Sequence, residues 1–169
     1  PTIYNATYVG AGTSEQMLKF EDSFGVNYYN SVFVGAEQQL INASGTDMDD
    51  RISAADCDFV SSSIAYDING TTGALANADI SDQATLATAV ATGNNNILGG
   101  TNPFATLTSA TVRTNVDPRV TTAANNVVTL ASPSATYFIP ASYAGAFDPV
   151  ESDYWSDDWS VFSADIDNK

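Results

Sequence analysis

The sequence predicts an all-β protein, a right-handed parallel β-helix or solenoid in which short strands of successive coils stack on one another. Three observations support it. A short motif recurs 25 residues later, brief β-branched and aromatic runs separate its copies, and the polar residues are Thr, Ser, Asn, Gln and Asp rather than Lys and Glu. One coil cannot bury its apolar side alone, so such a repeat favours coils stacked in register. An antiparallel β-sandwich is the alternative, and it would require the repeat to be accidental.

The repeat is the clearest signal in the first part of the chain. The segment Asn5-Ala-Thr-Tyr-Val-Gly-Ala11 recurs as Asn30-Ser-Val-Phe-Val-Gly-Ala36, and a weaker third copy lies at Ser62-Ser-Ile-Ala-Tyr-Asp67. Shorter strands are expected between the copies, at Met17–Phe20 and Gln39–Asn42. In a solenoid these segments would occupy equivalent positions of successive coils.

Alternation along each copy assigns its side chains to two faces. Val32 and Val34 share one face of the second copy, whereas Phe33 lies on the other. Val9 is the counterpart of Val34 in the first copy. We therefore expect Val9 and Val34 to stack in the interior of the coils, with their backbones running in the same direction.

Asparagine and glycine mark the two ends of each copy. Asn5 and Asn30 are expected at equivalent corners, where their stacked amides would bond to one another and to the turn backbone. Gly10 and Gly35 come directly after the strands, where a turn often requires a positive φ. The solenoid prediction depends structurally on these four residues and the two stacked valines.

The whole chain is expected to form a single β-solenoid domain. Its predicted parts are the coils in residues 1–70, a helical excursion in residues 71–103, and the last coils with a cap in residues 104–169.

One short lateral helix and a C-terminal cap complete the predicted fold. The alanine-rich segment Asp79–Ala91 predicts the helix, with Ser81 or Asp82 as its capping residue. Strands are expected at 105–113, 126–130 and 137–139. An open solenoid end invites pairing with other strands, so the aromatic end of the chain is expected to cover the last coil.

The C-terminal region also resembles a known group of proteins. Tyr137-Phe-Ile-Pro-Ala-Ser-Tyr-Ala-Gly-Ala-Phe-Asp-Pro149 and Tyr154-Trp-Ser-Asp-Asp-Trp-Ser-Val-Phe162 resemble the ending of large secreted bacterial surface proteins, where it follows parallel β-helix coils. Val116-Asp-Pro-Arg119 is similar to a segment that precedes that ending, without the proline and glycine that come next there. The resemblance implies this fold and an extracellular or cell-surface location, and it assigns no reaction.

Charge and composition exclude several classes of function. The chain has 20 acidic residues, five basic residues and no histidine, for a net charge of −15. Nucleic acid and anionic membranes are disfavoured as partners, because both need a Lys/Arg-rich surface. The sequence contains no apolar run long enough for membrane insertion. Cys57 is the only cysteine, so it can form no internal disulfide and is expected to be a small buried apolar residue.

A group of aspartates is the one candidate metal site. Asp47, Asp49 and Asp50 alternate in a polar segment, and carboxylates in a loop can bind Ca²⁺, which prefers six to eight oxygen ligands. The glycine and glutamate of an EF-hand loop are absent. A solvated acidic turn with Arg51 as its counter-charge is the competing interpretation.

Aromatic and acidic residues near the C-terminus are the candidate carbohydrate site. Trp155, Trp159 and Asp157 combine rings that can stack on a sugar with a carboxylate that can bind hydroxyl groups. The alternative is that the two Trp side chains pack onto the last coil and the acids face water.

The sequence favours a protein without catalysis. The absence of histidine excludes a Ser-His-Asp triad, and no phosphate-binding or dinucleotide-binding glycine motif occurs. We expect an extracellular structural module, as in a cell-surface layer, an adhesin or a filament subunit, which self-associates or binds other surface proteins. No organic cofactor is expected, and Ca²⁺ is the only candidate ion. A carbohydrate-binding or polysaccharide-degrading β-helix is the alternative, with Arg51 as the basic residue to test.

Overall fold

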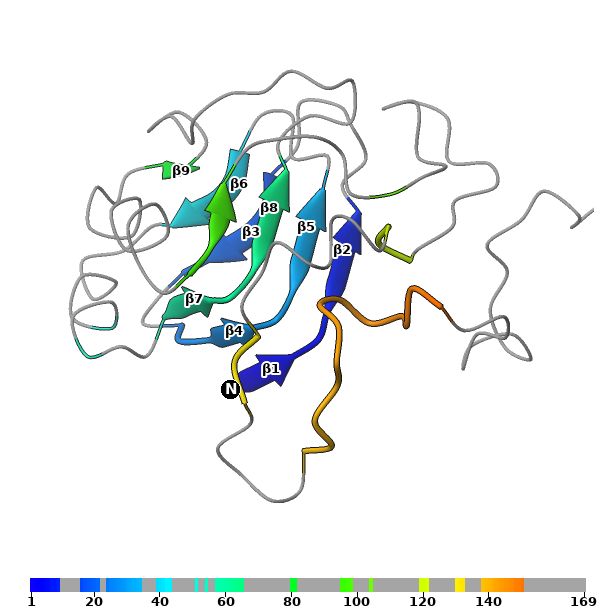
Figure 1. Cartoon of the computed structure of the whole chain (residues 1–169). Helices are drawn as coiled ribbons and strands as arrows, with labels where there is room; N and C mark the ends of the chain where they lie inside the picture. The colour runs from blue at the N-terminus through cyan, green and yellow to red at the C-terminus, as the bar shows by residue number, and fades with distance from the viewer. Residues whose placement is uncertain are drawn as a thin grey trace, which may run out of the picture.

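Short strands dominate the described part of the chain (Figure 1). The computed structural model describes residues 1–9, 16–21, 24–34, 39–43, 51, 54, 57–65, 80–81, 95–98, 104, 119–121, 130–132 and 138–150. The strands are β1 (Thr2–Tyr4), β2 (Thr7–Val9), β3 (Gln16–Phe20), β4 (Asn27–Tyr29), β5 (Val32–Val34), β6 (Gln39–Ala43), β7 (Asp58–Val60), β8 (Ser63–Ala65), β9 (Ile80–Ser81) and β10 (Ile97–Leu98).

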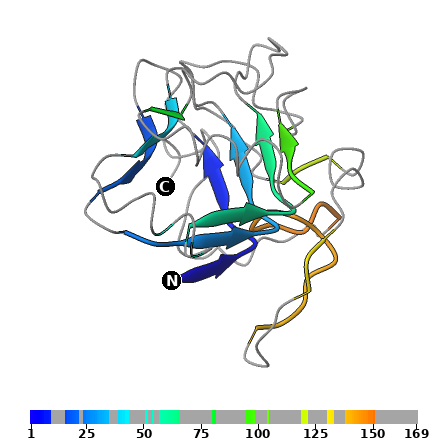
Figure 2. The ribbon, with the colours of Figure 1, turned by 90° about the vertical axis from the view of Figure 1, so that its left-hand side faces the viewer.

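These strands form three parallel sheets. The first has the order β1-β4-β7, the second β10-β8-β5-β2, and the third β3-β6-β9. The chain visits the three sheets in turn, so β1, β2 and β3 form a first rung, β4, β5 and β6 a second, and β7, β8 and β9 a third; β10 belongs to a fourth (Figure 2). All pairs between named strands are parallel. The described residues therefore support an all-β protein and give no support to an antiparallel sandwich.

The register of the second sheet confirms the sequence repeat. Thr7 pairs with Val32 and Val9 with Val34, as the prediction of stacked parallel copies requires. The third copy continues the stack, since Val34 also pairs with Ala65. The strands predicted between the copies are confirmed as β3 and β6, which pair with each other in the third sheet.

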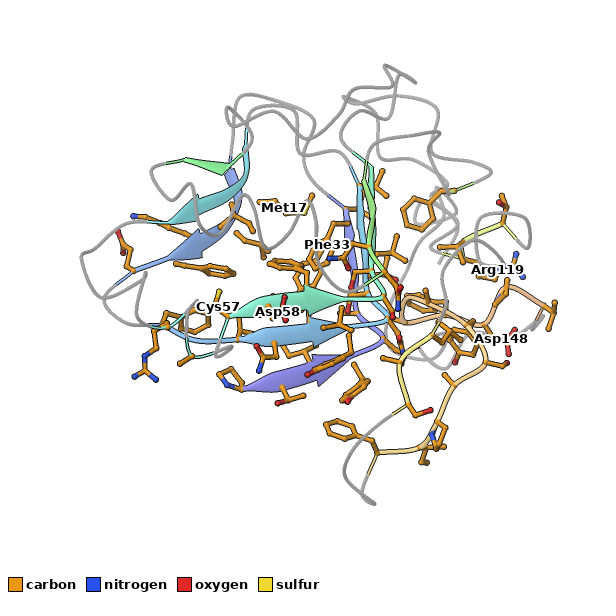
Figure 3. All side chains as sticks on the ribbon, turned by 60° about the vertical axis from the view of Figure 1, so that its left-hand side comes forward. Met17, Phe33, Cys57, Asp58, Arg119 and Asp148 are labelled. Atoms are coloured by element: carbon orange, nitrogen blue, oxygen red, sulfur yellow. The ribbon has the colours of Figure 1, made fainter. Side chains whose placement is uncertain are left out.

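The predicted orientation of the two faces of β5 is wrong. Phe33 contacts Tyr28 and Phe59 of the first sheet, with ring centroids 5.3 and 5.4 Å apart, so Phe33 points into the space between the sheets (Figure 3). Val32 and Val34 are on the opposite side and are nevertheless fully buried. Alternation separates two faces, but it does not show which one lies inside when later segments cover the outer one.

The outer face of the second sheet is covered by residues from the C-terminal half of the chain. Val32 and Val34 form a buried cluster there with Phe104, Val120 and Ala144, and Leu130 packs against it. An isolated antiparallel bridge joins Phe104 to Val120. The same sheet therefore has an apolar core on each side, which explains why Val32, Phe33 and Val34 are all buried.

Aromatic side chains fill the space between the first two sheets. The rings of Tyr8 and Phe33 stack at 4.9 Å, and those of Tyr28 and Phe59 stack at 5.2 Å. Complete burial of one such ring contributes on the order of 1.5–3 kcal/mol. Cys57 is 1% exposed beside this cluster, which confirms that it is a buried side chain. Burial raises the pKa of its thiol to about 11, so the sulfur is a neutral thiol near pH 7.

Two predicted elements are described only in part. Ile80 and Ser81 form β9, although Ser81 was a predicted cap of the helix in Asp79–Ala91, and residues 82–91 lie outside the described residues. β9 and β10 also show that the predicted excursion, residues 71–103, contributes strands to two sheets. The strand predicted at 137–139 is wrong in its described part, because Phe138 and Ile139 belong to no strand. Among the described residues, no helix has the length and apolar character to cross a membrane.

The described part of the C-terminal region lies on the first two rungs rather than on the last one. We refer to residues 130–132 and 138–150 as the strap. Tyr143 and Ala146 are bonded to the first rung, and Ala131 and Gly145 to the second. Figures 1 and 2 both show the strap beside the bend between the first two sheets. The predicted position of the cap is therefore wrong for these residues.

Candidate functional site

A two-residue corner links the first sheet to the second in the first three rungs, and the equivalent two residues precede β10 in the fourth. Its first positions are Asn5, Asn30, Ser61 and Asn95, with φ values of 55°, 51°, 51° and 61°. Its second positions are Ala6, Ser31, Ser62 and Asn96. Asn tolerates this left-handed conformation better than most residues, because its short polar side chain can bond locally. The prediction that Asn5 and Asn30 occupy equivalent corners is confirmed.

The second corner positions form a ladder of hydrogen bonds between rungs. The backbone N–H of Ala6 donates to Ser31 Oγ at 3.2 Å, and that of Ser31 donates to Ser62 Oγ at 3.2 Å. The N–H of Ser62 donates to Asn96 Oδ1 at 3.0 Å. Each side chain thus accepts a bond from the preceding rung, and the ladder satisfies N–H groups that the bend removes from the sheets.

The same side chains also donate to backbone carbonyl groups. Ser31 Oγ donates to the carbonyl of Tyr29 at 3.0 Å, and Ser62 Oγ donates to that of Val60 at 3.2 Å. Asn96 Nδ2 donates to a carbonyl of the third rung, that of Phe59, at 2.7 Å. The buried polar residues among those described are all at the corner. They are Asn30, Ser31, Ser61 and Ser62.

The amides of the corner asparagines bind the strap. Asn30 Nδ2 donates to the carbonyl of Ala131 at 2.8 Å, and the N–H of Ala131 donates back to Asn30 Oδ1 at 2.7 Å. Asn5 Nδ2 donates to the carbonyl of Tyr143. The prediction that these amides bond to one another is therefore wrong. The segment that covers the corner supplies backbone partners, which the sequence repeat alone does not contain.

The strap also donates backbone hydrogen bonds to the first two rungs. The N–H of Gly145 donates to the carbonyl of Asn30 at 2.7 Å, and the N–H of Ala146 donates to Thr7 Oγ1 at 2.8 Å. Gly145 has a φ of 85°, and a Cβ there would lie 2.7 Å from Thr7 Oγ1 and 3.3 Å from Val32 Cγ2. Only glycine fits this close approach without displacing the strap.

Aromatic rings on the outer face of the first sheet join the strap to the first rung. Tyr4 and Tyr29 are paired in register, and their rings stack at 4.6 Å with 13° between the planes. Phe138 of the strap packs on Tyr4 at the same centroid distance. Partial burial raises the pKa of Tyr29. The stacked ring faces are apolar, so this contact adds packing to the hydrogen bonds that hold the strap at the corner.

Most of the residues chosen from the sequence as sites lie outside the described residues. This holds for the metal candidates Asp47, Asp49 and Asp50, for the carbohydrate candidates Trp155, Asp157 and Trp159, and for the turn residues Gly10 and Gly35. Arg51 is described and exposed. In the part that the structure describes, no three or more Asp, Glu, His or Cys side chains gather as a metal site. The Ca²⁺ and carbohydrate sites therefore stay predictions.

Sequence reasoning missed the residues that connect the strap to the corner. Thr7, Gly145 and the backbone of Ala131 are far apart in the chain, at separations of 101 to 139 residues from their partners. The recurrence of Asn at one position of the repeat was the available signal, and it identified the corner but not the partner. The corner and the first rung hold the strap through amide and hydroxyl groups that bond to its backbone. We compared the chain with protein-family models, curated proteins and solved structures, and none of them matches it.

Proposed function

We propose that this chain is a non-catalytic structural module of an extracellular or cell-surface protein, built from coils of a right-handed parallel β-helix. The observation that carries the proposal is the in-register stacking of successive rungs through three parallel sheets, with a hydrogen-bonded ladder at their corner. A repeated coil of this kind builds a rigid elongated body from units that contact only their neighbours.

The use of the polar side chains supports a structural role. Ser31 and Ser62 each hold one neighbouring backbone group as donor and another as acceptor. Asn30 is 2% exposed and is bonded to the strap through both atoms of its amide. These groups have the partners that stability requires, and that arrangement favours a scaffold.

The proposed location rests on composition and resemblance. The tail motif at Tyr137–Pro149 resembles the ending of secreted bacterial surface proteins, and the net charge of −15 would keep such a module soluble in a salt-rich exterior. Self-association, or association with other surface proteins, is the form of partnership that stacked coils favour, because their ends present strand edges.

Two experiments test this proposal. Cell fractionation with an antibody to this chain should place the protein in the medium or on the cell surface, and electron microscopy of the purified material should show fibres, sheets or associated particles. Recovery of the protein only from the cell interior would contradict the location. Hydrolysis or elimination of a polysaccharide by the purified chain would contradict the non-catalytic role.

A further inference from the structure

The strap is attached to the rungs without taking part in their sheets. Its residues belong to none of the strands, so the three sheets pair without it. The hydrogen bonds described above join it to the side chains of Asn5, Thr7 and Asn30 and to the carbonyl of Asn30, a corner residue outside the strands. These bonds can therefore break while every bond between strands stays in place.

Asn30 makes the two kinds of contact with different groups. Its side-chain amide is bonded to Ala131 of the strap, whereas its backbone N–H donates to the carbonyl of Val60 in the third rung at 3.1 Å. Asn5 divides its bonds in the same way, because its side chain donates to the strap and its backbone N–H donates to the carbonyl of Tyr29 at 2.9 Å. The corner thus separates attachment of the strap from stacking of the rungs.

Burial indicates that the strap is held less firmly than the rungs. Ala144 and Phe147 are its buried apolar side chains, whereas Ile139 is 91% exposed and Val150 is 77% exposed. Among the described residues, the largest fully buried side chains all lie outside the strap. Segments that bury little apolar surface open at a lower free energy than the rest of a protein. The strap is therefore the part we expect to open first.

The strap covers an apolar side chain of the second sheet. A Cβ on Gly145 would lie 3.3 Å from Val32 Cγ2, so the strap backbone lies directly on Val32. Val32 is fully buried and shares its cluster with Ala144 of the strap. Departure of the strap would expose this side chain next to the corner amides and the Thr7 hydroxyl.

We propose that the strap is a latch, which opens as one unit while the rungs stay folded and uncovers Val32 together with the corner amides. The uncovered surface combines an apolar side chain with the donors and acceptors that bind the backbone of the strap in the closed state. The latch therefore controls access to this surface.

Native-state hydrogen exchange of the complete chain, followed by NMR at urea concentrations below unfolding, tests the opening. The N–H groups of Ala131, Gly145 and Ala146 are bonded to the rungs and should share one protection factor. That factor should be roughly tenfold or more below those of the backbone N–H groups of Asn5 and Asn30. Equal protection of strap and rungs would overturn the latch, and unequal protection within the strap would overturn its opening as one unit.

Thiol labelling tests whether the opening uncovers Val32. Val32→Cys and Val26→Cys, each in a Cys57→Ala background, place the probe at positions that are 0% and 1% exposed, and Val26 lies outside the cluster that the strap covers. Val32→Cys should react roughly tenfold or more faster, because Val26→Cys is exposed only when the rungs unfold. Equal rates would overturn the uncovering of Val32.

Asn95→Ala separates the two routes to exposure. It strains the fourth corner, and no described strap residue is bonded to the side chain there, so it destabilises the closed and the open states equally relative to the unfolded chain. Labelling of Val26→Cys should rise roughly fivefold, and that of Val32→Cys should not change. A parallel rise at both positions would show that Val32 is exposed only by global unfolding and would overturn the latch. That result leaves the proposed function standing, because it rests on the stacked rungs.

Discussion

Replacement of Asn30 by alanine should weaken the attachment of the strap to the second rung. The substitution removes two hydrogen bonds between the amide and Ala131, at 2.8 and 2.7 Å. Each such bond contributes about 0.5–1.5 kcal/mol net, so their loss costs about 1–3 kcal/mol. Alanine at a φ of 51° adds roughly 1 kcal/mol of backbone strain. We expect Asn30→Ala to lower the free energy of unfolding by about 2–4 kcal/mol in all.

Asn95→Ala is the control that separates the two contributions. Asn95 occupies the same corner position with a φ of 61°, its side chain is exposed, and no described strap residue is bonded to its amide. This variant should show only the backbone strain, roughly 1 kcal/mol. Asn30→Gly should show the reverse, with the bonds lost and the strain relieved.

Equilibrium unfolding in urea measures these differences, and limited proteolysis reports whether the strap has been released. The Asn30→Ala variant should be cut in the strap faster than the wild type, and Asn95→Ala should not. Equal destabilisation by Asn30→Ala and Asn95→Ala, with equal rates of cleavage, would refute the conclusion that the corner amide holds the strap.

Three other outcomes follow from the same contacts. Val34→Asp should prevent stable folding because it places an unpaired charge in a buried cluster. Val9→Asp, at the equivalent position of the first rung, should be tolerated because Val9 is 36% exposed. Similar unfolding curves for the two variants would contradict this difference in burial. Gly145→Ala should destabilise the protein and release the strap, because the added Cβ would lie 2.7 Å from Thr7 Oγ1. Urea unfolding would detect the loss of stability, and limited proteolysis would detect the released strap. The Cys57 thiol, whose pKa is raised from 9.0 to about 11 in the folded state, should react slowly with a thiol reagent at neutral pH. Because the folded state keeps this proton more tightly, the contribution of the thiol to stability is complete below pH 9 and is lost as the pH rises towards 11. Urea titrations of Cys57→Ser at increasing pH should lack this decline.

The local repeat was sufficient to predict the register of the second sheet. Identical residue types 25 positions apart stack most favourably when their strands are parallel and without offset, and Val9 does pair with Val34. The same reasoning found the equivalent corners at Asn5 and Asn30, because a recurring polar residue between two apolar runs marks a bend. These features depend on short-range pattern, which a single sequence contains.

The inward face and the partners of the corner were not predictable in this way. Both Val34 and Phe33 are apolar, so alternation separates them without showing which one faces the other sheets. Asn30 has partners 101 residues away, in a segment with no periodic pattern and no strand at its described positions. The position of the strap on the first two rungs follows from contacts between residues more than 100 positions apart in the sequence.

The sequence by itself therefore determined the strand-rich character of this protein, the parallel repeat and the acidic, cysteine-poor composition, since each depends on residue type and spacing along the chain. Only the tertiary structure decided which face of β5 lies inside, where the strap docks and what the corner amides bind. The physical reason is that a buried polar group takes whichever partner the folded chain places within hydrogen-bonding distance, and that distance is a property of the packing rather than of the spacing in sequence.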